Sequence, residues 1–172
     1  LGRDPNQRHI ITSSSATGTG VPFRWNDLPS DYRDWLDDNP ETVLVDDDDA
    51  GEKRLVHEAG LEVFDMRFID EMGMRHAMEL ALATLDANTH LHVSFDVDFL
   101  DPDIAPGVGT TVKGGPTYRE AQLCMEMIAD TGRLASLDLM ELNPTLDDHN
   151  RTADVAVDLI ESLFGKSTLM RK

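Results

Sequence analysis

Two aspartates separated by a single valine end the clearest strand pattern in the chain. Residues 94–102 read SFDVDFLDP, with Asp96 and Asp98 directly after an apolar run. Carboxylates this close repel each other unless one is protonated or a cation lies between them. Hard oxygen ligands of this kind suit Mg²⁺, Mn²⁺ or Ca²⁺. The pair therefore predicts a divalent-cation site, although a polar strand face turned toward water explains the spacing equally well.

Side chains alternate between polar and apolar along residues 90–98, as expected for a strand with one buried face. The polar face carries His90, His92, Ser94, Asp96 and Asp98. At about 3.3 Å per residue, the Cα atoms of Asp96 and Asp98 would be about 6.6 Å apart, whereas His92 would lie about 13 Å from Asp96. We therefore expect His92 to be a packed or solvated strand histidine and not a third ligand.

Acids also follow two other predicted strands. The run VDDDDAGEK begins where the strand pattern at 42–45 ends, and Glu141 lies at the end of the pattern at 134–143. The loop after Asp98, LDPDIAPGVGTTVKGG, is rich in Pro and Gly, which is typical of a shaped binding loop. Ligands of open parallel sheets bind beyond the carboxyl ends of the strands. Three acidic strand ends favour a shared pocket for cations.

Strand and helix patterns alternate from residue 41 onward, which predicts an open, mostly parallel α/β sheet flanked by helices. Parallel strands are expected near 42–46, 61–66, 91–97 and 134–141. Helices are expected at 50–60, 69–88, 117–132 and 152–165. The third helix has the clearest ends, because Thr117 and Glu120 form a capping-box pair and Gly132 follows its last turn.

The first 40 residues have a different character. They include four prolines and the small-residue run TSSSATGTG. We expect an irregular, poorly ordered leader over 1–40, with one short helix at 30–39, followed by the α/β domain over 41–172.

Composition limits the classes of partner. The chain of 172 residues has 15 basic and 33 acidic residues, a net charge of −18, which disfavours nucleic acid and anionic membranes and favours cations. No apolar run approaches the 18 residues of a membrane span. The single cysteine, Cys124, leaves no internal disulfide, so a cytoplasmic location is expected.

Several motifs together resemble the carboxyl-terminal half of the arginases, members of the ureohydrolase family. They are SFDVDFLDPDIAPGVGT, GGPTYREA, MELNP and ESLFG, and the similarity runs roughly over residues 42–169. The resemblance implies part of a three-layer α/β fold. It also implies hydrolysis of L-arginine to L-ornithine and urea by hydroxide held on two Mn²⁺ ions, in a homo-oligomer (a trimer or hexamer) when complete.

The resemblance also implies roles for individual residues. Asp96 and Asp98 would be metal ligands, with Asp96 bridging both ions. Glu141 would hold the substrate guanidinium, and Thr110 would lie nearby in the loop. The substrate α-amino group would meet Asp49, together with Asp47.

Other motifs of the family do not occur in this sequence. The family has a further histidine ligand, an Asp-Ala-His-x-Asp motif and an Asn-x-His-Gly stretch with a proton-shuttle histidine, and none of these is present. We therefore assign no catalytic residue, expect a gap beside the strand that carries Asp96, and expect little or no urea from the isolated chain. The alternative is a non-catalytic acidic domain that binds a divalent cation or a partner subunit.

Overall fold

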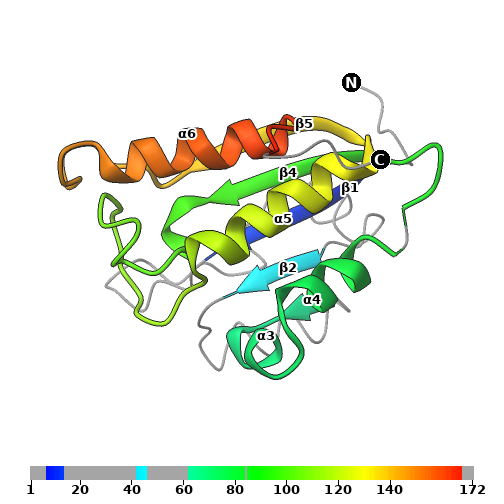
Figure 1. Cartoon of the computed structure of the whole chain (residues 1–172), viewed down its shortest axis with the longest axis horizontal. Coiled ribbons are helices and arrows are strands. Elements are labelled where there is room, and N and C mark those ends of the chain that lie inside the picture. Colours follow the sequence, from blue (N-terminus) through cyan, green and yellow to red (C-terminus); the bar gives the residue numbers. More distant parts are fainter. Residues whose placement is uncertain (1–6, 14–41, 46–61, 84, 168–172) are drawn as a thin grey trace, which may run out of the picture.

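The computed structural model describes residues 62–83 and 85–167 in full, and the backbone of strands at 7–13 and 42–45 (Figure 1). The helices expected at 30–39 and 50–60 lie outside these residues, as do Asp47 and Asp49.

One parallel sheet of five strands, in the order β3-β2-β1-β4-β5, forms the centre of the described fold. The strands are β1 (Gln7–Ser13), β2 (Thr42–Val45), β3 (Glu62–Phe64), β4 (His90–Asp96) and β5 (Leu134–Met140). Every pair of neighbours is parallel, so the predicted open parallel α/β sheet is confirmed. The four expected strands are all present, and β1 is an addition to them.

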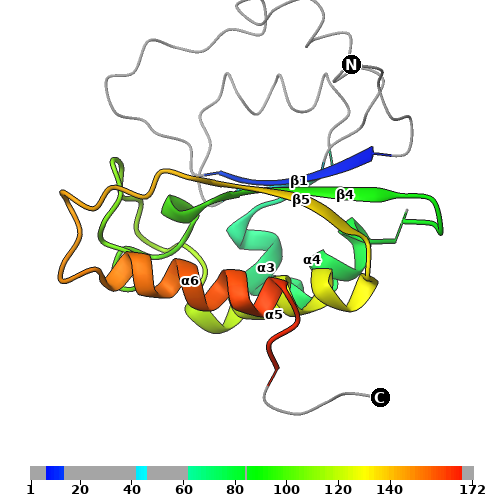
Figure 2. The same ribbon diagram turned by 90° about the horizontal axis from the view of Figure 1, so that it is seen from above.

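The helices of the described part all lie on one face of the sheet (Figure 2). They are α3 (Met66–Met72), α4 (Met74–Ala81), α5 (Tyr118–Thr131) and α6 (Arg151–Leu163). None of the helices within the described ranges has the length and hydropathy that a membrane crossing requires. The described residues thus supply two of the three layers that the resemblance implies.

The end signals of α5 act as predicted. Thr117 and Glu120 form a complete capping box, and Gly132 ends the helix with a φ of 62°. The helix expected over 69–88 is wrong in its extent, because Gly73, with a φ of 86°, separates α3 from α4. Asp65 also starts α3 earlier than expected, since its side chain accepts a hydrogen bond from the backbone N–H of Phe68.

Strand β1 corrects two expectations. Residues Gln7–Ser13 are not irregular: their backbone pairs with β2 on one side and β4 on the other. No gap lies beside β4 either, because β1 occupies that position with Ile10 opposite Val93. The physical reason is that two long-range hydrogen-bond ladders stabilise a short β-branched run that the local composition does not single out.

The core lies between the sheet and the helices. The apolar face of β4, with Leu91, Val93 and Phe95 each 1% exposed, belongs to one buried cluster with side chains of α4, α5 and α6. Burial of each such side chain stabilises the fold by roughly 1.5–3 kcal/mol. This packing holds β4 in place and leaves its polar face, including Asp96, on the side away from the described helices.

Candidate metal centre

The chain turns directly after β4, and this turn decides where the two aspartates lie. Val97–Phe99 form a single turn of 3-10 helix, η2, whose first residues are capped by Asp96. The Asp96 carboxylate accepts a hydrogen bond of 3.2 Å from the backbone N–H of Asp98. The expectation that both aspartates share one extended strand face is therefore wrong for Asp98, which is only 4% exposed.

The two carboxyl groups lie together at the end of β4, with Asp98 buried and Asp96 half-buried. Oδ1 of Asp98 is the one buried side-chain oxygen or nitrogen in the described residues that has no hydrogen-bond partner. Burial, followed by the hydrogen bond and the charge of Asp98, raises the pKa of Asp96 to about 8. A raised carboxyl pKa beside a second carboxyl is the signature of two acids that cannot both ionise. A bound cation would remove this conflict.

Glu141 follows the last residue of β5 and approaches the same place. Its negative charge contributes to the raised pKa of Asp96. A Cβ added to Gly109 would lie 3.5 Å from Oε2 of Glu141, so the Glu141 side chain lies against the loop in which Thr110 is the next residue. The structure thus brings Asp96, Asp98, Glu141 and the Thr110 loop together at two of the three predicted acidic strand ends, and the third end, after residue 45, lies outside the described residues.

The backbone of Glu141 is in the left-handed region, with a φ of 63°. For a non-glycine residue this conformation costs on the order of 1–3 kcal/mol and persists only where the surroundings impose it. Here Leu142 forms an antiparallel bridge to Val108, and the N–H of Asn143 donates to the carbonyl of Gly107 at 2.8 Å. These bonds fix the turn after β5 and aim Glu141 at the loop.

The first turn of α6 anchors the same loop from the other side. The N–H of Gly107 donates to the buried Thr152 hydroxyl at 2.7 Å. The carboxylate of Asp147 accepts from the N–H groups of Thr152 and Ala153 at 3.0 and 3.2 Å. Burial alone would raise the pKa of Asp147, but these hydrogen bonds outweigh it and lower the pKa. We call Asp147, Thr152 and Gly107 the loop clamp.

A second aspartate closes the far end of the loop. Asp101 accepts hydrogen bonds from the N–H groups of Asp103 and Gly114, at 2.8 and 2.9 Å. Sequence reasoning missed the positioning roles of Asp101 and Asp147. The signal for both was present in the short polar segments around them, since Asp in loops often accepts from nearby backbone N–H groups.

His92 behaves as a strand histidine, as predicted. Its Nδ1 lies 2.7 Å from Oγ of Ser136, and its Nε2 lies 3.5 Å from a carboxylate oxygen of Asp138, both on β5. In the part of the chain that the structure describes, no group of three or more His, Cys, Asp or Glu side chains is arranged to hold a metal. The described residues thus supply a carboxyl pair and not a complete ligand shell.

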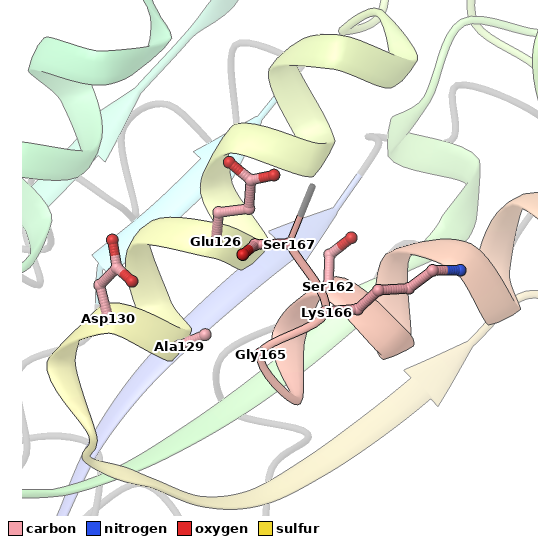
Figure 3. Close-up of a pocket in the computed structure, with 7 residues that line it drawn as sticks. All are labelled: Glu126, Ala129, Asp130, Ser162, Gly165, Lys166 and Ser167. Atoms are coloured by element: carbon pink, nitrogen blue, oxygen red, sulfur yellow. The ribbon is translucent and has the colours of Figure 1, made fainter. Parts of the chain in front are cut away.

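A separate pocket lies at the carboxyl-terminal ends of α5 and α6 (Figure 3). Its volume is about 270 Å³, and its lining includes Glu126, Asp130, Ser162 and Lys166. The ammonium group of Lys166 is already paired with Glu161 and with Asp158. None of the residues predicted for the site lines this pocket, so we do not assign it to the chemistry.

The sequence matches a family model described as "Arginase family" over residues 40–165. An arginase of Agrobacterium fabrum is 53% identical over 124 residues, which cover 72% of this chain and 38% of that protein. An arginase of Bacillus subtilis is 47% identical over 121 residues, 70% of this chain and 41% of that protein. The chain therefore spans about two fifths of the length of these relatives.

Solved structures of arginases also match this chain. The crystal structure of the Bacillus subtilis arginase matches with a TM-score of 0.73 and 43% identity, over 76% of this chain and 48% of that one. The Entamoeba histolytica arginase, solved in complex with L-ornithine, matches with a TM-score of 0.73 over 95% of this chain and 62% of that one. At 21% identity, this second likeness supports the fold alone.

Proposed function

The chain belongs to the arginase family, and we propose that it forms the carboxyl-terminal part of a site that hydrolyses L-arginine to L-ornithine and urea. The observation that carries this proposal is the carboxyl pair at the end of β4. Asp98 has a buried oxygen without a hydrogen-bond partner, and Asp96 has a pKa raised to about 8. Two acids with a buried, unpartnered oxygen and a raised pKa destabilise the strand end, which favours a functional role over a purely structural one.

Asp96 and Asp98 would hold divalent cations, and we propose Mn²⁺, with two ions in a complete site. The fit is supported by the chemistry of the donors, since carboxylate oxygens suit this class of ion and the unpaired Oδ1 of Asp98 offers a lone pair to it. When bound, such ions lower the pKa of water and so supply a nucleophile at neutral pH. Two carboxylates are only part of the required shell, so we expect weak binding by this chain alone.

Glu141 is proposed to bind the substrate guanidinium, with Thr110 beside it. The position of Glu141 supports this role, because its carboxylate lies against the loop and close enough to Asp96 to affect the pKa of that residue. A charge-assisted hydrogen bond of this type contributes roughly 1.5–3 kcal/mol. The α-amino group of arginine is proposed to meet Asp49 and Asp47, which lie outside the described residues.

The specific reaction depends on ligands and a proton shuttle that the sequence does not contain, so the isolated chain is expected to release little or no urea. Assembly into a trimer or hexamer remains a prediction of the resemblance, and a cytoplasmic location remains a prediction from the single cysteine. The second candidate function is a non-catalytic acidic domain that binds a divalent cation or a partner subunit. It is favoured by the lack of a three-residue metal group among the residues the structure describes.

Titration calorimetry with Mn²⁺ tests the proposal on the chain as it stands. We expect one weak binding event, which Asp96→Ala abolishes and Glu141→Gln retains. Asp103→Ala is the matched control, because it removes an exposed acid from the same loop. Mn²⁺ binding that survives Asp96→Ala would refute the assignment of the pair. Two tight sites, or brisk urea release from L-arginine by the chain alone, would refute the view that its ligand set is incomplete.

A further inference from the structure

A histidine, a serine and an aspartate meet on the face of the sheet that points away from the described helices. Nδ1 of His92 on β4 lies 2.7 Å from Oγ of Ser136, and Nε2 of His92 lies 3.5 Å from a carboxylate oxygen of Asp138. Ser136 and Asp138 are two residues apart on β5, so they share one face of that strand. We call these three residues the His92 cluster. The Asp138 side chain is 65% exposed, so the carboxylate end of the cluster is accessible.

The His92 cluster is separate from the carboxyl pair in both place and chemistry. His92 precedes Asp96 by four residues on β4, which is about 13 Å at about 3.3 Å per residue. The carboxyl pair offers oxygen atoms alone, whereas the cluster offers an imidazole nitrogen together with a carboxylate oxygen. Imidazole ligands suit Zn²⁺, Cu²⁺ and Ni²⁺, whereas oxygen ligands suit Mg²⁺, Ca²⁺ and Mn²⁺. An ion at the cluster would therefore belong to a different class from the one proposed for the carboxyl pair.

The distance between Nε2 of His92 and the Asp138 oxygen fits two donors to one ion. At 3.5 Å, this distance is longer than a direct N–H···O hydrogen bond, which spans about 2.7–3.2 Å. Nitrogen and oxygen donors lie about 2.0–2.2 Å from Zn²⁺, and tetrahedral geometry then places two such donors about 3.3–3.6 Å from each other. The observed separation thus leaves room for a Zn²⁺ ion between the two atoms.

The Ser136 hydroxyl decides which ring nitrogen faces Asp138 as an acceptor. When Nδ1–H donates to Oγ of Ser136, the neutral ring carries its lone pair on Nε2, the nitrogen on the Asp138 side. Histidines that bind metals almost always donate their other ring N–H to a neighbour, which fixes the orientation of the ring. In this tautomer Nε2 and the Asp138 carboxylate are both acceptors, and a cation between them satisfies both.

The register of the sheet places a second histidine beside the cluster. His9 on β1 is the register partner of His92, which in turn is the register partner of Ser136 on β5. Register partners on neighbouring strands occupy the same face of a sheet, and these strands are about 4.7–4.9 Å apart. Figure 2 shows β1, β4 and β5 side by side in one layer, with the helices on one side of it. The backbone alone carries this placement of His9.

We propose that His92 and Asp138, together with His9 of β1, bind one Zn²⁺ ion, and that Ser136 positions the His92 ring. Three protein donors and one water complete a tetrahedral shell. The ion links β1 to β4 and β5 and so stabilises the position of β1 in the sheet. β1 lies before residues 40–165, which match the family model, so this site combines a residue outside the matched part with two residues inside it. It is independent of the proposed reaction.

Calorimetric titration of the full chain with Zn²⁺ tests the site. We expect one Zn²⁺ ion per chain. Ser136→Ala should weaken its binding by about 10–100-fold, the usual effect of removing the partner of a metal-bound histidine. His92→Ala, Asp138→Asn and His9→Ala each remove a donor and should weaken binding by more. Co²⁺ in place of Zn²⁺ should give the visible absorption of a tetrahedral ion in the parent, and Asp138→Asn should lose it.

His149→Asn is the matched control. It removes a histidine that contacts another aspartate, Asp148, in an exposed loop, and its φ of 54° suits asparagine. Zn²⁺ binding should persist in this variant and in Asp96→Ala, and circular dichroism should show the same folded signal for all variants. If His92→Ala does not fold, Asp138→Asn decides, because its side chain is exposed.

Three results would overturn the proposal. Loss of Zn²⁺ binding in Asp96→Ala would place the ion at the carboxyl pair. Binding that tolerates Asp138→Asn or His9→Ala would show that the three strands do not share the ion. A parent chain that binds no Zn²⁺ would leave His92 and Asp138 as an ion pair only. None of these results bears on Mn²⁺ binding by Asp96 and Asp98, which is measured separately.

Discussion

The carboxyl pair at the end of β4 lowers the stability of the metal-free chain, and Asp98→Asn is expected to recover part of the loss. Oδ1 of Asp98 is buried without a partner, and the pKa of Asp96 is raised to about 8, first by burial and then by its contact with Asp98. Asparagine carries no charge at this position, and its amide can donate to the Asp96 carboxylate. The variant should therefore be more stable than the parent when no divalent cation is present.

The size and pH dependence of the gain follow from the same observations. A hydrogen bond from the new amide to the charged Asp96 carboxylate, in place of repulsion between two acids, is worth about 1.5–3 kcal/mol, which corresponds to roughly 3–12 °C in Tm for a chain of this length. The pKa of Asp96 is higher in the folded chain than its ordinary value of 3.8. The contribution of Asp96 to the stability of the folded chain is therefore complete below pH 3.8 and is lost as the pH rises through about 8. The advantage of Asp98→Asn should therefore be small at pH 5 and largest at pH 8.

Thermal unfolding at pH 5 and pH 8, in EDTA and in Mn²⁺, measures the difference in stability between Asp98→Asn and the parent. In EDTA, Asp98→Asn should unfold at a higher temperature than the parent at pH 8. In Mn²⁺, it should lose the stabilisation that the parent gains on binding the ion. Asp103→Asn, which removes an exposed charge from the following loop, should follow the parent in both conditions. If Asp98→Asn unfolds earlier than the parent at pH 8 in EDTA, the repulsion between the two carboxyls is not a source of instability.

Two predictions concern the loop clamp. Asp147→Ala removes the acceptor for the N–H groups at the start of α6 and should destabilise the chain by about 1–2 kcal/mol at pH 7, as measured by urea denaturation. Because the pKa of Asp147 is lowered in the folded state, the difference between variant and parent should disappear as the pH falls below 3.8. Gly107→Ala would place a Cβ 2.5 Å from Cβ and Cγ of Asp147 and should cost about 1–3 kcal/mol in the same assay, whereas Gly109→Ala, whose nearest neighbour is 3.5 Å away, should cost much less. Equal effects of the two glycine variants would contradict the close contact.

The parts of the fold that depend on local signals were predictable. The alternation along β4 gave the correct buried face, and the capping box and Gly132 gave both ends of α5. The family resemblance rested on several motifs rather than one, and the family match confirms it. Strand β1 was not predictable in the same way, because its pairing with β2 and β4 involves residues far apart in the sequence.

The geometry of the site was harder to predict than its residues. A strand and the single 3-10 turn at Val97–Phe99 have similar apolar spacing over three residues, so the burial of Asp98 could not be read from the pattern. The left-handed backbone of Glu141 is equally hidden, since a glutamate has no local preference for it. The turn at Glu141 is held by contacts with the loop that begins at residue 101, and these contacts exist only in the folded chain.

These contacts also explain why the site residues can be held in place even though the ligand set is incomplete. The buried face of β4 fixes Asp96, the turn at η2 buries Asp98, and the bonds between the loop and the segment after β5 orient Glu141. The loop clamp ties that arrangement to the first turn of α6. A divalent cation would thus meet a carboxyl pair that is already positioned and would not need to reorganise it.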